Sequence, residues 1–184
     1  MKKLSLIAAA FSMLTLVSCE KDEDGNPDNS SRNVLNYNEQ ELEINFANTI
    51  DFGSTISTGN RVNEFHTQSF LLGDGNYSAE TETTTGGYRF ATKLISEGSD
   101  FTPGTFTIIS HEAMATNLPY GNASLVLDAN EDNILNGADT EIEAVGGTVT
   151  IEGTADNYTI TVDVDLSNNE KLTGEYTGTV TVVE

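Results

Sequence analysis

The sequence predicts an all-β fold, a single antiparallel β-sandwich with a β-barrel as the alternative, on three observations. Apolar and polar residues alternate with a period of two over long runs, of which residues 158–166 form the clearest. Turn residues separate the candidate strands at intervals of roughly 8–12 residues, which is the spacing of sandwiches and barrels. The strict period of two over the C-terminal runs also leaves little room for helix.

The first half of the candidate domain contains five expected strands. In chain order they span residues 42–46, 61–72, 77–84, 88–95 and 105–110. The first carries apolar residues at every second position, which is typical of a half-buried strand. Gly86 and Gly87 are expected to turn the third strand back onto the fourth as a β-hairpin. Residues 111–122, with Pro119 and Gly121, read as irregular.

The second half contains four expected strands, at residues 123–127, 148–152, 158–166 and 172–182. Every second residue from Tyr158 to Leu166 is apolar, so one face of this strand should be buried. The last strand alternates apolar residues and Gly against Thr and Glu. A short helix over residues 140–145 is the one helical alternative, and Gly146 and Gly147 would end it.

The chain divides into three segments. Residues 1–18 form a targeting segment, with Lys2 and Lys3 ahead of an apolar stretch that is too short to span a membrane comfortably. Residues 19–33 read as a flexible tether that is rich in Gly, Asn, Asp and Ser. Residues 34–184 read as one β-sandwich domain of about 150 residues, enough to bury a sizeable core.

Leu16-Val17-Ser18-Cys19 resembles the lipobox of bacterial lipoproteins. The resemblance implies cleavage before Cys19, lipidation of its sulfur and acylation of the new amino terminus. Cys19 is the only cysteine in the sequence, so an exported chain would otherwise carry an unpaired thiol. Several acyl chains would anchor the protein to a membrane, since each buried methylene contributes about 0.8 kcal/mol.

An acidic run, Glu20-Lys21-Asp22-Glu23-Asp24, follows the lipobox directly. It resembles the surface-export signal of Bacteroidota lipoproteins, which implies an outer-membrane protein that faces the cell exterior. The alternative is a generic soluble tether. In that case the run would not indicate whether the protein faces the periplasm or the cell exterior. The C-terminal run of residues 146–178 is also similar to the meander of uncharacterised Bacteroidota surface lipoproteins, and that similarity implies no activity.

The sequence is strongly acidic, with a formal net charge of −21. Loss of Lys2 and Lys3 with the targeting segment lowers this value by two, to −23. Such a charge argues against partners made of nucleic acid or anionic lipid surface. It favours solubility and the binding of divalent cations.

Residues 128–139 have the spacing of a calcium-binding loop. Oxygen-bearing side chains fall at loop positions 1, 3, 5, 9 and 12, and calcium takes six to eight oxygen ligands. The expected metal ligands are Asp128, Asn130, Asp132, Ile134 through its backbone carbonyl, Asn136 and Asp139. The alternative is an acidic, solvated connection without a metal.

The pattern of this loop resembles the calcium loop of dockerin repeats, a variant of the EF-hand loop. Asn133 stands where the sharp turn favours Gly, and Asn is the next best residue at positive φ. Asp139 closes the loop as in dockerins, in place of the EF-hand Glu. The preceding residues read as a strand, so we expect one loop that joins two strands, without a pair of helices.

No catalytic signature is recognisable, and the chain is not expected to be an enzyme. His66 and His111 are isolated, and no Gly-x-Ser-x-Gly elbow or phosphate-binding loop is present. The expected function is a non-catalytic binding, adhesion or glycan-capture module with calcium as a tentative cofactor. Tyr120 is the best candidate for an exposed aromatic residue. The alternatives are a barrel that carries a small apolar ligand and, third, a hydrolase.

Overall fold

The computed structural model describes residues 33–58, 62–78, 80–81, 83–112, 117–154 and 156–183. The predicted signal peptide, the lipidated Cys19 and the tether up to residue 32 lie outside the described residues. The described part contains fourteen strands and no helix, so the prediction of an all-β fold is confirmed. A helix long and apolar enough to cross a membrane is therefore also absent from these residues.

The strands are β1 Val34–Tyr37, β2 Gln40–Glu43, β3 Phe46–Thr58, β4 Val62–Gly73, β5 Asn76–Ser78, β6 Thr83–Thr85, β7 Tyr88–Glu97, β8 Gly104–Ile108, β9 Tyr120–Leu127, β10 Ile134–Leu135, β11 Thr140–Thr154, β12 Asn157–Leu166, β13 Lys171–Gly178 and β14 Thr181–Val183.

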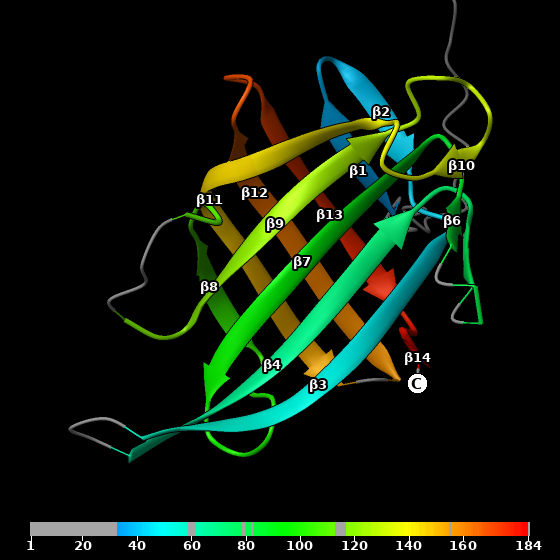
Figure 1. Ribbon diagram of the computed structural model, residues 1–184. Coiled ribbons are helices and arrows are strands. Elements are labelled where there is room, and N and C mark those ends of the chain that lie inside the picture. The colour runs from blue at the N-terminus through cyan, green and yellow to red at the C-terminus, as the bar shows by residue number, and fades with distance from the viewer. Residues whose placement is uncertain are drawn as a thin grey trace, which may run out of the picture.

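Eleven of these strands form one strongly curled sheet, in the order β14-β3-β4-β7-β9-β8-β11-β12-β13-β1-β2. The sheet folds over on itself, so that β12 and β13 lie behind β4, β7 and β9 in Figure 1. Its edge strands are β14 and β2. A small sheet of β10, β6 and β5 lies at one end of the large one (Figure 1).

The core fills the space between the two halves of the curled sheet. Phe70, Phe90 and Phe106 are fully buried there, and each such ring contributes about 1.5–3 kcal/mol to stability. The rings of Phe70 on β4 and Tyr158 on β12 meet edge to face, with 5.5 Å between their centroids. The predicted apolar face of residues 158–166 is buried at every second position, as expected.

β11 is the strand on which the sheet turns its corner. Its first residues pair with β9 and its later residues with β8 and β12. The register shifts between Ala144 and Gly146, and Gly147 has a φ of +94°. A Cβ at Gly147 would lie 2.2 Å from the carbonyl oxygen of Asp163. The bend therefore requires glycine both for its backbone conformation and for space.

The topology differs from the expectation in three respects. The hairpin predicted around Gly86 and Gly87 does not form, because β7 pairs with β4 and β9 while β6 pairs with β5 and β10. The strand predicted over residues 172–182 is divided into β13 and β14. β14 pairs in parallel with β3, and β8 in parallel with β9, so the sheet is mixed although most of its pairs are antiparallel.

Candidate functional site

The predicted calcium loop connects two neighbouring strands. β9 ends at Leu127 and β11 begins at Thr140, and these two residues face each other in the antiparallel ladder. The expectation of one loop between two strands, with no pair of helices, is confirmed. The short helix considered over residues 140–145 is wrong, because these residues are the first part of β11.

Short-range hydrogen bonds shape the inside of the loop. The amide of Asp132 donates to Asn130 Oδ1 (3.0 Å), and the amide of Ile134 donates to Asp132 Oδ1 (2.9 Å). The amide of Asn133 donates to Asp128 Oδ2 over 2.7 Å. Asn133 has a φ of +62°, which is the conformation predicted for this position. These bonds hold the backbone of the loop in a series of tight turns.

Asp139 closes the loop. Its carboxylate accepts hydrogen bonds from the amides of Ala129 (3.1 Å) and Asn136 (2.7 Å), near the beginning and the end of the loop. At the other end of the loop, Asp128 Oδ1 is buried and has no hydrogen-bond partner among the described residues. A buried carboxylate oxygen without a partner is costly. A cation at this oxygen would relieve that cost.

The predicted ligands are in part engaged with each other. Asn130 donates from its side-chain amide to Asp132 Oδ2 (3.1 Å), and Asn136 donates in the same way to the carbonyl of Ile134 (2.9 Å). In the described part of the chain, no three His, Cys, Asp or Glu side chains lie close enough together to hold a metal ion. The predicted calcium ligands differ from such a cluster, because three of the six are two Asn side chains and one backbone carbonyl. Calcium at the Ile134 carbonyl would compete with the Asn136 amide or share this oxygen with it, because a carbonyl oxygen has two lone pairs.

The loop is attached to the turn that precedes β7 (Figure 1). The amide of Asp128 donates to the Gly87 carbonyl over 2.9 Å, and Ile134 pairs with Thr85. On the opposite side of this turn, Asp74 accepts hydrogen bonds from the amides of Gly87 and Tyr88, each over 3.1 Å. Besides its covalent ends on β9 and β11, the loop is therefore held by hydrogen bonds to the turn that precedes β7.

A hollow of about 610 Å³ lies on the outer face of the sheet, on the side away from the core. Its lining residues are Ile50, Ser69, Leu71, Ala91, Thr92, Lys93, His111, Asn122, Ala123, Ser124, Glu141 and Glu143. The hollow arises because small side chains lie next to each other across the strands. Ala91 on β7 faces Ser124 on β9, which faces Glu143 on β11. We refer to this feature as the outer-face hollow.

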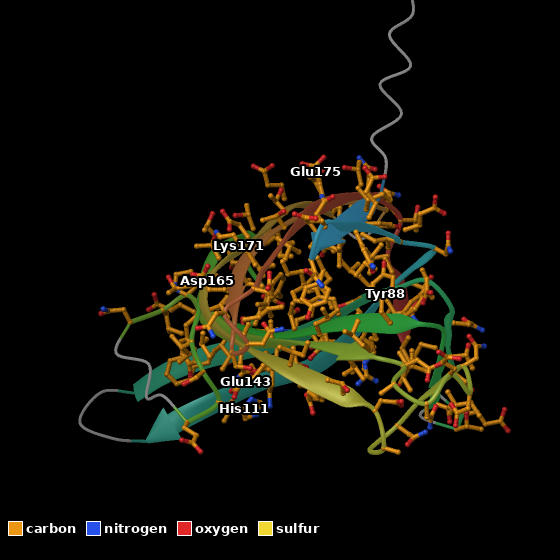
Figure 2. The ribbon with its side chains drawn as sticks, turned by 90° about the horizontal axis from the view of Figure 1, so that it is seen from above. Tyr88, His111, Glu143, Asp165, Lys171 and Glu175 are labelled. Atoms are coloured by element: carbon orange, nitrogen blue, oxygen red, sulfur yellow. The ribbon has the colours of Figure 1, made fainter. Side chains whose placement is uncertain are left out.

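Charged and aromatic side chains surround the outer-face hollow. His111 donates from its backbone amide to Glu143, and the two side chains lie side by side in Figure 2. His111 Nδ1 is 3.9 Å from Glu143 Oε1. On the β7 side, Lys93 Nζ lies 5.4 Å from the ring centre of Phe52, an exposed residue of β3. The hollow therefore has hydrogen-bond donors and acceptors at its rim and an aromatic ring next to Lys93.

Tyr120, the predicted exposed aromatic residue, is half-buried. It is two positions from Asn122 on β9, so both residues lie on the outer face. The exposed ring beside the hollow is instead Phe52, which no sequence pattern indicated as a site residue. Glu141 and Glu143 were also missed. Their alternation with Ile142 and Ala144 indicates a polar face of a strand, but it does not reveal which strands lie beside that face.

His66 is buried, and both of its ring nitrogens are engaged. Nδ1 donates to the carbonyl of Ser99 (2.8 Å), and Nε2 lies 2.7 Å from Asp51 Oδ1. Neither nitrogen is free to activate a nucleophile. His66 therefore has a structural environment, and among the histidines only His111 borders the outer-face hollow.

Comparisons with protein-family models, with curated proteins and with solved structures find no match for this chain. The class of protein is thus defined by the fold and the candidate sites alone: an all-β domain of one curled sheet, with an acidic loop and an outer-face hollow.

Proposed function

We propose that this chain is a non-catalytic binding module, displayed on the outer membrane as a lipoprotein anchored through Cys19, that captures a neutral oligosaccharide in the outer-face hollow. The observation that carries the proposal is the combination of groups around this hollow. Glu141 and Glu143 would accept hydrogen bonds from sugar hydroxyls, while Lys93 and Asn122 would donate them. Phe52 would offer a ring face beside them.

The charge of the chain supports a neutral ligand. A formal net charge of −21 repels acidic glycans and other polyanions. Both signs of charge are present around the hollow itself, with Glu141 and Glu143 on β11 and Lys93 on β7. Such a mixed rim suits a ligand that carries many hydroxyl groups and no charge of its own.

Calcium in the loop of residues 128–139 would support this site from one end. Asp139, the last residue of the loop, is two residues before Glu141, and β11 begins directly after it at Thr140. Glu141 is the first carboxylate of the hollow along the chain. A metal held by the predicted ligands of residues 128–139, with Asn side chains and the Ile134 carbonyl among them, would fix the spacing of β9 and β11 at the loop. The unpartnered Asp128 Oδ1 is the feature that favours a metal over an empty acidic turn.

The two alternatives receive less support. Twelve large side chains are almost fully buried in the described part, including Phe70, Phe90 and Phe106. This packed interior favours binding on the surface over the transport of an apolar ligand inside. The side chain of His111 is 76 % exposed. A general base or acid usually works in a site shielded from water, so this exposure favours binding over hydrolysis.

A glycan array tests the proposal. The fluorescently labelled mature chain, made as Cys19→Ser to keep it free of lipid, is applied with calcium to printed neutral, acidic and amino-sugar oligosaccharides. We expect signal on neutral oligosaccharides that Glu143→Gln lowers at least about tenfold, equivalent to about 1.4 kcal/mol. The control is Glu152→Gln, an exposed residue of β11 that does not line the hollow. Equal signal from both variants, or signal on acidic glycans alone, would contradict the proposed site.

Display on the cell surface is tested separately. Intact cells that express the wild-type chain are treated with a protease, and the chain should be cut while a periplasmic protein stays whole. The Cys19→Ser variant should leave the membrane fraction, because the anchor is lost. Full protection of the wild-type chain on intact cells would contradict display.

A further inference from the structure

Half of strand β3 is an open edge of the large sheet. β3 pairs along its whole length with β4 on one side. On the other side, β14 covers only Asn48–Ile50. No described strand pairs with the second side of residues 51–58. Apart from the amide of Gly53, which donates to Asp51 Oδ1, the backbone amides and carbonyls that point outward along this stretch are therefore available to another strand.

Exposed apolar side chains gather along this edge. Phe52 and Ile56 on β3 are each 57 % exposed, and Val182 on the neighbouring β14 is 55 % exposed. They are three of the five large apolar residues exposed in the described part, which also include Ile134 and Val145. Exposed apolar groups along one strand edge are typical of an interaction surface.

This edge also lacks the usual protection against strand pairing. Natural edge strands carry Lys, other charges or Pro, which discourage a second strand. Residues 52–58 contain no charged residue and no Pro, although 29 of the 184 residues are Asp or Glu. The neighbouring charges lie outside this stretch: Asp51, whose carboxylate is bonded to His66, Lys93 beside the ring of Phe52, and Glu64, which pairs with Ile56 from β4. Within β3 itself, the bulge between Asp51 and Gly53 is a protective feature, and it lies at the inner end of the open stretch.

We propose that a second copy of this chain pairs with the open edge of β3, so that two β3 strands form an antiparallel ladder around a two-fold axis. A strand that meets its own copy across such an axis makes the same contacts on both sides. Two molecules with a net charge of −21 repel each other at most approaches. The neutral stretch 52–58 is where they meet with the least repulsion.

The shape of the molecule supports this choice of occupant. The β3–β4 hairpin extends beyond the body of the sheet in Figure 1, so two copies joined there would keep their acidic bodies apart. The dimer would also place two outer-face hollows on one continuous sheet. A repetitive glycan could then occupy both hollows, which increases the apparent affinity.

Sedimentation equilibrium of the mature Cys19→Ser chain tests the proposal, at physiological salt and over a range of concentrations up to about 200 μM, in the affinity range of weak and transient interfaces. We expect a monomer–dimer equilibrium. Ile56→Glu and Ile56→Lys should both raise the dissociation constant at least about tenfold, because both place a charge in the ladder. The two variants change the net charge in opposite directions, so a dimer controlled by overall charge would respond to them in opposite ways.

The control is Val145→Glu, which changes an exposed residue (48 %) of β11 and should leave the dissociation constant unchanged. Thermal unfolding of each variant shows whether the fold is intact. A wild-type chain that stays monomeric over the whole range would overturn the proposal. So would a dimer that Ile56→Lys and Val145→Glu affect equally.

Discussion

Asp51 Oδ1 and His66 Nε2 lie 2.7 Å apart across β3 and β4. The same carboxylate oxygen accepts a hydrogen bond from the amide of Gly53, also over 2.7 Å, and so holds the β3 bulge. The other ring nitrogen of His66 donates to the carbonyl of Ser99. Both ring nitrogens of His66 therefore lie within hydrogen-bond distance of an oxygen atom. The pair connects the bulge of β3 with the turn after β7.

This pair should be stabilising. Replacement of Asp51 by Asn removes the charged acceptor of a buried imidazole, and we expect the free energy of unfolding to fall by about 1–3 kcal/mol. Urea unfolding of Asp51→Asn measures the loss. Glu97→Gln is the control, because it removes one charge from an exposed position at the end of β7. If both variants lose the same stability, the pair contributes nothing beyond the overall charge.

Because the phenol of Tyr88 is buried, the folded state should lose stability at alkaline pH. Burial raises the pKa of its phenol well above the ordinary 10.0, and the nearby Asp74 and Glu43 raise it further. Burial also raises the pKa of Tyr158 and of Tyr176. Because the pKa is raised in the folded state, the stabilisation is complete below about pH 10 and is lost as the pH rises through the folded pKa.

The variant Tyr88→Phe checks this source of pH dependence. The Tyr88 hydroxyl bonds to the carbonyls of Leu42 (3.2 Å) and Glu43 (3.0 Å), so its removal should cost about 0.5–1.5 kcal/mol at neutral pH. Above about pH 10 the variant should lose stability less steeply than the wild type, because one buried phenol is gone. Unfolding midpoints in urea at several pH values measure both effects. Parallel curves for the two proteins would contradict the role given to Tyr88.

Gly147 should be the most sensitive glycine of the β11 corner. Its φ of +94° and its close approach to the Asp163 carbonyl leave no room for a side chain. We expect Gly147→Ala to lower the free energy of unfolding by about 1–3 kcal/mol or more. Gly104→Ala is the matched control, because a Cβ there would meet nothing within 4 Å. Thermal unfolding compares them, and equal midpoints would mean that the corner tolerates a side chain.

Calcium should stabilise the fold through the loop. With a dissociation constant near 0.1 mM, about 1 mM calcium adds roughly 1.4 kcal/mol. This raises the thermal midpoint by about 2–5 °C for a domain of this size. Asp128→Asn should abolish the shift, while Glu131→Gln, an exposed loop residue outside the predicted ligand set, should retain it. A shift that persists in Asp128→Asn would mean that calcium only screens the net charge, and no shift in the wild type would leave an acidic connection.

The parts of the fold that depend on local pattern could be predicted from the sequence. The period of two from Tyr158 to Leu166 identifies β12 and its buried face. The spacing within residues 128–139 predicts a loop between two strands, and the loop joins β9 to β11. The sequence also predicts a positive φ at Asn133, and the structure has a positive φ there. Both predictions depend on neighbouring residues only, so they needed no knowledge of which strands pair.

The prediction of a hairpin at Gly86 and Gly87 was wrong because the pairing of β7 depends on strands that are distant in the sequence. A turn signal is local, but β7 buries Tyr88, Phe90 and Leu94 in the core by pairing with β4 and β9. That burial outweighs the pairing that the turn alone would favour. The parallel pairing of β14 with β3 has no local signal at all.

The outer-face hollow could not be predicted, because it depends on the register of several strands. Ser69, Lys93 and Asn122 become neighbours only because β7 lies between β4 and β9 in one particular alignment. A shift of one residue would turn these side chains to the other face. For the same reason Phe52 could not be recognised as the ring beside Lys93.

The central claim is that the outer-face hollow binds the ligand, and amide chemical shifts test it most directly. The neutral oligosaccharide that gives the strongest array signal is titrated into the ¹⁵N-labelled chain in calcium. The account predicts that the shifts cluster on Lys93, Asn122, Ser124, Glu141 and Glu143. Shifts that cluster instead on the exposed face of β12 and β13, around Asp163 and Lys171, would contradict it.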